Sequence, residues 1–371
     1  MQRNSGPAQR LTISLGAIAD NYRLCQAQNN GPVAAVVKAN AYGLGAAPIA
    51  THLQQQGCCH FFVATLSEAL ALRNHIPDQN VTIYVLEGLL AGPSEYVEGN
   101  VVPVLNTVQQ CQRWHAADQP WRVHVDTGMQ RLGLNAAELI NLVRELNPQL
   151  DLLISHFACA DQPELAENAQ QLQQVARLFS SIEQIQGRRV AVSLGNTAGL
   201  MQVVNKTALN ETTLNNNLGR AGIGLYGANP YTDQANPFFP VACLEGQILQ
   251  LRDVPEGTPV GYGGTFVTQS ASRLATVGLG YADGVPRLLS NLGRVWCGEA
   301  YAPIVGRVSM DLLTVDVTHI SGLNPGDWIE VFGPHISVDE VAVHAQTIGY
   351  EVLTGLGSRP ARHYQLEHLD Q

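Results

Sequence analysis

The sequence predicts two domains of α/β + β class: a (β/α)8 TIM-like barrel over residues 1–230 and a mainly β C-terminal domain over residues 231–371. Two observations support this prediction. In the first two-thirds of the chain, short and nearly continuous apolar strands alternate with amphipathic helical stretches, as in a parallel sheet. Beyond residue 230 the strands are short, and Gly and Pro turns separate them.

Eight stretches of the first domain are predicted as strands. They are VAAVVKA, HFFVAT, VTIYVLEG, VVPVLN, WRVHVDTG, DLLISHFA, VAVSLGN and GRAGIGLYG. Helices are predicted in LGAAPIATHLQQQG, SEALALRNHI, AELINLVRELN and NAQQLQQVARLFSSIEQIQG. Eight such units in about 200 residues favour a closed barrel. An open doubly wound sheet is the alternative, but no GxGxxG motif follows a strand, which weakens a dinucleotide-binding version of it.

The stretch ANPYTDQANPFFP holds three prolines and is typical of a linker. The predicted strands after it are EGQILQLRDV, TPVGYGGTFVT, RLATVGLGYADG, GRVWCG, YAPIVGRVS, LLTVDVT and DWIEVFG. One helix is expected in SVDEVAVHAQTIG, where Ser337 and Glu340 have the spacing of a capping box.

The composition excludes several functional classes. A formal net charge of −10 argues against nucleic-acid binding, which favours clustered Lys and Arg. The seven cysteines form no CxxC pair, so scattered reduced thiols in a cytoplasmic protein are expected, with neither a disulfide framework nor a metal site. No apolar run reaches the length of a membrane span, and the polar first ten residues predict no secretory signal.

Polar residues gather where the predicted barrel strands end, which is the face on which barrel enzymes place their chemistry. In chain order they are Lys38, Tyr42, Asp126, Arg131, His156, Asn196, Thr197, Arg220, Gly222 and Ile223. Each has an ordinary structural explanation alone, such as a lysine whose stem is buried and whose ammonium reaches water. Together they suggest a lysine that condenses with an aldehyde, beside hydroxyls and amides that bind a phosphate. This combination describes a pyridoxal phosphate (PLP) site.

Seven motifs, in order from about residue 10 to the end of the chain, then show a family resemblance. They are VVKANAYG, VDTGMQRLG, SHFACAD, RAGIGLYG, VGYGGTF, GYADG and GRVSMD. Together they resemble the alanine racemases, the fold type III PLP-dependent enzymes. The resemblance implies an isomerase that interconverts L-alanine and D-alanine and supplies D-alanine for cell-wall peptidoglycan.

The resemblance also implies roles for matching residues. Lys38 would bond to PLP and act as base on one face of the substrate, and Tyr262 would be the base on the opposite face. Arg131 would bind the substrate carboxylate and reach the phenolic oxygen of the cofactor. The remaining implied substrate-binding residues are Met310, through its amide, the nearby Asp311, and Tyr281 at the entrance.

For the cofactor, the resemblance places His156 against the pyridine ring and Arg220 at the pyridine nitrogen. The full cofactor-binding set is Lys38, Tyr42, His156, Asn196, Thr197, Arg220, Gly222, Ile223 and Tyr350. Hydrogen bonds from Arg220 to His156 and from His156 to Tyr262 are expected to lower the pKa of the tyrosine, so that it can act as a base. Arginine retains its proton, so it donates to the ring nitrogen without protonating it. A homodimer is also implied, in which Lys38 meets the other subunit's Tyr262.

The sequence departs from the family pattern at three positions. His124 stands where the family often has a lysine whose carbamate orients the arginine equivalent to Arg131, and a histidine cannot form that carbamate. Thr197 replaces a common serine, and Leu44 replaces a frequent histidine. Three alternatives stay open: a serine or broad-specificity racemase, because one hydroxyl discriminates weakly; a decarboxylase of the same fold; and a non-catalytic PLP-binding protein.

Overall fold

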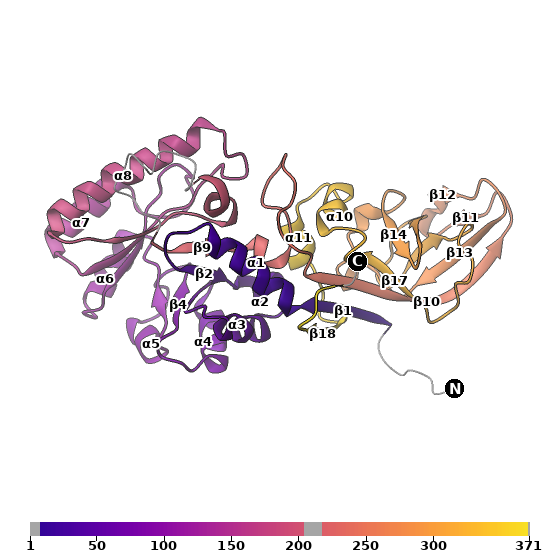
Figure 1. The fold of residues 1–371 in the computed structure, drawn as a ribbon, viewed down its shortest axis with the longest axis horizontal. Coiled ribbons are helices and arrows are strands. Elements are labelled where there is room, and N and C mark those ends of the chain that lie inside the picture. The colour runs from indigo at the N-terminus through magenta and orange to yellow at the C-terminus, as the bar shows by residue number, and fades with distance from the viewer. Residues whose placement is uncertain (1–7, 204–216, 370–371) are drawn as a thin grey trace.

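A computed structural model describes residues 8–203 and 217–369 of the chain. The molecule is elongated, with a barrel at one end and a sheet-rich domain at the other (Figure 1). Within the described residues, no helix is both long and apolar enough to cross a membrane.

The predicted barrel strands all form, and they pair in parallel. They are β2 (Val33–Val36), β3 (His60–Val63), β4 (Thr82–Val85), β5 (Val102–Pro103), β6 (Trp121–His124), β7 (Leu150–Ile154), β8 (Ala191–Ser193) and β9 (Gly219–Ala221). Five of them follow the order β5-β4-β3-β2-β9 and three the order β6-β7-β8. A parallel bridge between Leu105 and Val123 joins the two groups. A hydrogen bond from the Arg220 amide to the Gly195 carbonyl (3.0 Å) links the other side, so the prediction of a closed barrel is confirmed.

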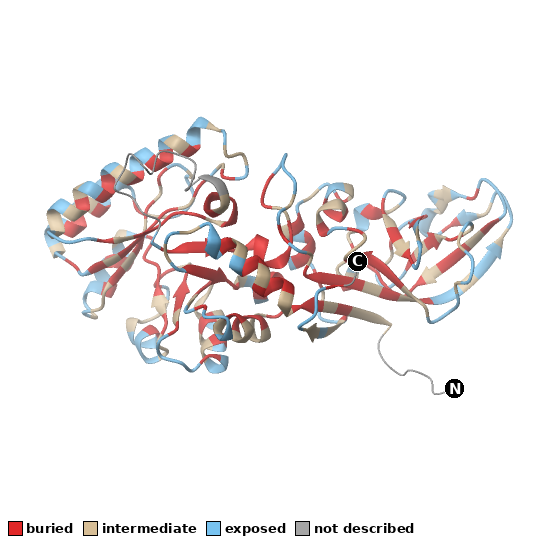
Figure 2. Cartoon of the chain, viewed as in Figure 1, coloured by how far each residue is buried: buried red, intermediate tan, exposed pale blue. Residues whose placement is uncertain are grey.

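Helices surround the barrel, with buried residues facing the strands and exposed residues facing outward (Figure 2). They are α1 (Leu15–Ala27), α3 (Ala46–Gln55), α4 (Leu66–His75), α5 (Pro93–Glu98), α6 (Val108–His115), α7 (Ala136–Leu146) and α8 (Ala166–Gln186). Thr65, Thr107 and Asn135 each cap a helix by accepting a hydrogen bond from an amide of its first turn.

The second domain is mainly β, as predicted. Its strands are β1 (Gln9–Ser14), β10 (Ala242–Val254), β11 (Pro259–Val260), β12 (Phe266–Val267), β13 (Ser272–Val277), β14 (Arg294–Cys297), β15 (Ala300–Pro303), β16 (Leu313–Asp316), β17 (Trp328–Phe332) and β18 (Ala361–Gln365). Helices α10 (Val338–His344) and α11 (Gly349–Thr354) pack against each other. Ser337 caps α10 as expected, but the Glu340 carboxylate pairs with Arg294.

The first described strand lies away from the barrel. β1 pairs antiparallel with β10 and parallel with β18, so residues 9–14 belong to the sheet of the second domain. The chain therefore leaves this sheet at Ser14 and enters the barrel through α1. The domain limit near residue 230 stays a prediction.

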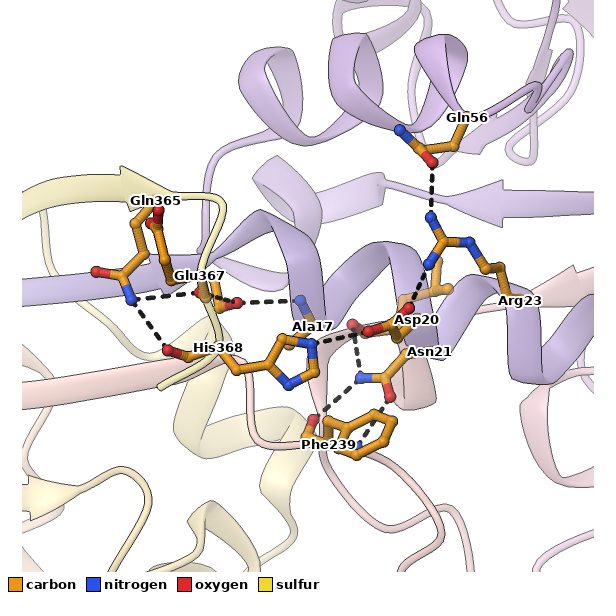
Figure 3. A network of polar contacts seen from close by, with 11 residues as sticks. Ala17, Asp20, Asn21, Arg23, Gln56, Phe239, Gln365, Glu367 and His368 are labelled. Carbon is orange, nitrogen blue, oxygen red and sulfur yellow. Dashed lines mark hydrogen bonds and ion pairs between the residues drawn. The ribbon is translucent and has the colours of Figure 1, made fainter. Parts of the chain in front are cut away.

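Polar contacts fasten α1 to two later segments (Figure 3). His368 Nε2 lies 2.8 Å from the Asp20 carboxylate. The Asn21 amide donates to the Phe239 carbonyl (3.0 Å) and accepts from the Phe239 N–H (2.9 Å). Ser14 Oγ donates to the Glu367 carbonyl. These contacts tie the chain end and the linker to the barrel, and so help to fix how the second domain sits on it.

Candidate active site

Lys38 follows β2 and begins a turn with left-handed backbone. Ala39, Asn40, Ala41 and Tyr42 all have φ between 52° and 54°. Residues with a Cβ avoid this region at a cost of about 1–2 kcal/mol each, so such a run persists only when its surroundings impose it.

Contacts from distant segments impose this conformation. The Ala39 N–H donates to Glu68 Oε1 (2.7 Å) at the start of α4. Arg362 of β18 donates to the Gly43 carbonyl (2.9 Å), just after the turn. A Cβ on Gly45 would lie 2.0 Å from Tyr364 Oη, so only glycine fits there. The second domain thus helps to hold the lysine at the end of its strand.

A cavity of about 760 Å³ opens at the carboxyl ends of the barrel strands. It gathers the predicted residues of the barrel and one from α11: Lys38, Tyr42, Arg131, His156, Asn196, Thr197, Arg220, Gly222, Ile223 and Tyr350. Asp126 lies beside it and binds amides of the Arg131 loop.

One part of the cavity wall has the form of an anion cradle. A Cβ built on Gly222 would lie 2.8 Å from Tyr42 Oη and 3.8 Å from Thr197 Oγ1, so the hydroxyls converge on a space that only glycine leaves open. The Tyr42 ring packs 6.1 Å from that of Tyr350. The Gly222 N–H donates to Thr197 Oγ1 (2.8 Å), and the helical turn Ile223–Tyr226 starts there. Hydroxyl donors around such a hollow suit a phosphate.

Arg220 is buried at the floor of the cavity. Its two terminal nitrogens donate to the carbonyls of Ser193 (2.8 Å) and Ser155 (2.7 Å). Burial lowers the pKa of the guanidinium to about 10, so it remains a cation at neutral pH. A cation whose terminal donors are committed keeps a fixed orientation.

Arg220 also sets the state of His156. Its Nη2 lies 3.2 Å from His156 Nδ1. A guanidinium only donates, so Nδ1 accepts and the ring proton sits on Nε2. Burial, followed by the positive charges of Arg220 and Arg131, lowers the pKa of His156 well below its usual value. His156 is therefore a neutral imidazole that can donate from Nε2.

The same environment acts on Lys38. Burial lowers the pKa of its amine, and the nearby Arg131 lowers it further. A larger fraction of the amine is then unprotonated at neutral pH, which is the form that attacks a carbonyl or accepts a proton.

The predicted residues of the second domain other than Tyr350 lie elsewhere. Tyr262 is 72% exposed and Met310 is 54% exposed, and neither lines the cavity of its own chain. Arg359 bonds to Asp311 (2.7 Å) and to the buried Asp283 (2.9 Å), which follows Tyr281 in a short helical turn. One chain therefore presents two separate groups: a cavity in the barrel and exposed loops on the β domain.

The sequence prediction missed Glu68, Asn106 and Arg359, which bind Ala39, His124 and Asp311 respectively and so support residues in or near the site. Thr65-x-x-Glu68 has the spacing of a capping box, so the sequence held a signal for the helix start at Glu68. No sequence pattern indicated Asn106 or Arg359, because their partners lie far away along the chain.

The residues fit PLP: an amine of lowered pKa, an anion cradle that a Cβ would fill, and a buried arginine lie in one cavity. Barrel and site define the class of PLP-dependent enzymes that carry the cofactor on a lysine at a strand end.

Both domains of the chain match models of one known protein family. Residues 13–230 match the model of the alanine racemase N-terminal domain, and residues 241–364 match that of its C-terminal domain. The chain therefore belongs to the alanine racemase family of PLP-dependent isomerases, as the sequence motifs predicted. An alanine racemase of Acidiphilium cryptum is 41% identical over 95% of this chain and 97% of its own length. A biosynthetic alanine racemase of Agrobacterium fabrum is 40% identical over 96% of this chain and 93% of its own.

A solved structure agrees with this assignment. The crystal structure of alanine racemase from Bartonella henselae, with covalently bound pyridoxal phosphate, superimposes with a TM-score of 0.86 at 37% identity. It covers 96% of this chain and 99% of that one.

Proposed function

We propose that this chain racemises alanine with two bases, its own Lys38 and the partner subunit's Tyr262, in active sites shared by a homodimer. The observation that carries the proposal is the separation of the two groups within one chain. Lys38 lines the barrel cavity, whereas Tyr262 is exposed on the other domain. A second copy is needed to bring a tyrosine to each lysine.

Several residues would hold PLP. Lys38 would bond to it covalently, and Tyr42, Thr197, Ile223 and Tyr350 would hold its phosphate, with Asn196 and Gly222 in the same wall. Arg220 would donate to the ring nitrogen through Nε, because its terminal nitrogens already donate to carbonyls. When bound, PLP withdraws electrons from the substrate Cα and so acidifies its C–H bond.

The chain's own groups then move the proton. Lys38 Nζ removes it from one face of Cα or returns it there, and the partner's Tyr262 Oη serves the opposite face. His156 donates from Nε2 to that tyrosine oxygen, and Arg220 fixes the imidazole in the required tautomer. Arg131 and the partner's Met310 amide bind the substrate carboxylate, with the partner's Asp311 and the partner's Tyr281 beside the entrance.

The exposed side chains around the second group support the dimer. Tyr262, Tyr281, Met310 and Leu312 are all exposed in the single chain. Large apolar side chains that gather on a surface indicate an interface. In a two-fold dimer a patch that covers the partner's cavity is matched by the same contact in reverse, so both sites would be completed together.

The first test is a chiral assay of the PLP-loaded protein with L-alanine, and with L-serine in parallel. Rapid formation of D-alanine with little D-serine supports the proposal. Comparable D-serine would favour a broad-specificity racemase. No D-alanine despite a borohydride-reducible adduct at Lys38 would contradict it.

Shared sites are tested by mixing two inactive variants, Lys38→Ala and Tyr262→Phe, and letting their subunits exchange. Each hybrid dimer then has one site with both native bases, so random pairing restores about a quarter of native activity. No recovery, with hybrid dimers demonstrated by native mass spectrometry, would contradict shared sites.

The proposed biological role is supply of D-alanine for peptidoglycan, as the family resemblance implies; relatives named biosynthetic and catabolic, both of Agrobacterium fabrum, are 40% and 38% identical to this chain. Expression in a bacterium that requires added D-alanine is expected to restore growth without it. The Lys38→Ala variant is the matched control and should fail to do so.

A further inference from the structure

The proposed mechanism assigns no role to His124, an imidazole in the wall of the cavity. His124 is the last residue of β6, and it lines the cavity with Lys38, Arg131, His156 and Arg220. The protonation state of its ring matters beside these cationic side chains. A protonated imidazole would repel them, whereas a neutral imidazole presents a lone pair that can accept a hydrogen bond.

The hydrogen bond on the side of the ring away from the cavity shows which ring nitrogen carries a proton. His124 Nδ1 lies 3.1 Å from Asn106 Oδ1. The Asn106 amide is fixed in this orientation, because its Nδ2 donates to the carbonyls of Leu86 (2.9 Å) and Val104 (2.8 Å). Asn106 therefore offers His124 only an acceptor, and Nδ1 carries the proton. In the neutral ring Nε2 is then a lone-pair acceptor.

The ring is neutral at physiological pH. Burial, followed by the charges of Arg220 and Arg131, lowers the pKa of His124 to about 4, although Asp126 acts in the opposite direction. A neutral Nδ1–H tautomer with an acceptor on Nε2 is the result.

The loop that carries Arg131 is built onto His124. The Leu134 N–H donates to the His124 carbonyl (2.9 Å), and the Asp126 N–H donates to the Leu134 carbonyl (3.0 Å). A Cβ on Gly133 would lie 3.1 Å from the His124 carbonyl oxygen, so the loop passes directly over the strand end. Both ends of the loop are thus fixed beside the histidine.

The carboxylates near this loop already accept hydrogen bonds from backbone amides. Asp126 uses Oδ1 for the amides of Gly128 and Met129 and Oδ2 for the amide of Arg131. Glu87 Oε1 accepts from the Leu66 N–H. Within the described parts of the chain, the Arg131 guanidinium has no hydrogen-bonded or ionic partner.

We propose that His124 is the positioning residue for Arg131: when substrate is bound, the guanidinium turns to donate to the Nε2 lone pair of His124, and this contact aims it at the substrate carboxylate. The inference rests on the proposed function only in assigning that carboxylate to Arg131. Asn106 acts one step further back, by fixing the imidazole tautomer.

Two variants separate positioning from packing. His124→Asn keeps a donor at the position of Nδ1, so the contact with Asn106 survives while the acceptor facing the cavity is lost. His124→Gln places a carbonyl oxygen near the position of Nε2, so the acceptor survives. Glu87→Gln is the control, because it changes a carboxylate of the cavity wall without touching His124.

Two binding readouts apply to the PLP-loaded dimer: KM and kcat for L-alanine, and the Kd of propionate, a carboxylate that cannot react. His124→Asn is expected to raise both KM and the propionate Kd about 10- to 100-fold, with a smaller change in kcat. His124→Gln and Glu87→Gln should stay near native values. Melting temperature and PLP absorbance check that each variant is folded and loaded.

A third readout needs no turnover. ¹⁵N NMR of the histidine rings is expected to show His124 as the neutral Nδ1–H tautomer at pH 7, and Asn106→Leu should disturb it. Native propionate affinity in His124→Asn would overturn the proposal, as would His124→Gln behaving like His124→Asn, a larger effect of Glu87→Gln, or the opposite tautomer. If the native protein fails to racemise alanine, the proposed function fails, whereas propionate binding and the tautomer still test His124.

Discussion

Replacing Gly222 by alanine is expected to weaken phosphate binding selectively. The added Cβ would lie 2.8 Å from Tyr42 Oη, a separation that Cβ atoms in proteins do not tolerate. The Tyr42 hydroxyl must retreat, while the hydrogen bond from the Gly222 N–H to Thr197 Oγ1 can remain, because that oxygen would lie 3.8 Å from the added Cβ.

The magnitude follows from the contact that is lost. A hydrogen bond from Tyr42 Oη to a phosphate oxygen is charge-assisted and contributes about 1.5–3 kcal/mol. Its loss corresponds to a roughly 10- to 150-fold rise in the Kd for PLP. Packing of the Tyr42 ring on Tyr226, with ring centroids 4.7 Å apart, limits how far the hydroxyl can move.

The assay is a titration of cofactor-free protein with PLP and, separately, with pyridoxal, which lacks the phosphate. The variant should lose affinity for PLP and keep its affinity for pyridoxal. Gly92→Ala is the matched control, because a Cβ there meets its nearest neighbour at 3.6 Å. An unchanged PLP affinity, or equal losses for PLP and pyridoxal, would refute the assignment of this wall to the phosphate.

Three further predictions concern the Lys38 turn and the cavity. Gly45→Ala should destabilise the protein by more than about 2 kcal/mol in urea unfolding, because Gly45 has φ 107° and its Cβ would strike Tyr364 Oη; a neutral result would contradict the tight contact. Glu68→Gln leaves one acceptor oxygen where the carboxylate has two, so it should lower the free energy of unfolding by about 1–3 kcal/mol and loosen the turn at Ala39. Unchanged stability and unchanged PLP binding would argue against this contact. The pKa of His124 is about 4 when folded against 6.5 ordinarily, so the unfolded chain binds more protons between these values. Stability is then lost as pH falls from about 6.5 to 4, by up to about 3 kcal/mol, and His124→Gln should reduce this slope in cofactor-free protein.

The barrel strands could be predicted because each carries its own signal. A run such as VAAVV in β2 is buried on both faces, and continuous apolar runs of this kind are typical of parallel strands. The polar residue that ends each run was visible for the same reason, so the members of the barrel site were predicted before their distances were known. The motif order added the proposed roles of Tyr262 and Met310, which composition alone did not indicate.

The left-handed turn after Lys38 could not be predicted in this way. Nothing local in Ala39–Tyr42 favours positive φ, and the contacts that impose it come from Glu68 and from Arg362, more than 300 residues away along the chain. The placement of β1 in the second domain has a similar cause, because its partners are β10 and β18. Short-range patterns contain no information about such pairings.

The sequence by itself determined the fold class, the family and the chemical groups that face the cavity. Only the tertiary structure decided the states of those groups. Arg220 fixes the proton of His156 on Nε2, and Asn106 fixes the proton of His124 on Nδ1, so two histidines in one cavity have opposite tautomers. The physical reason is that burial and the orientation of distant partners set where a proton lies. Neither quantity is written in the residues beside a histidine.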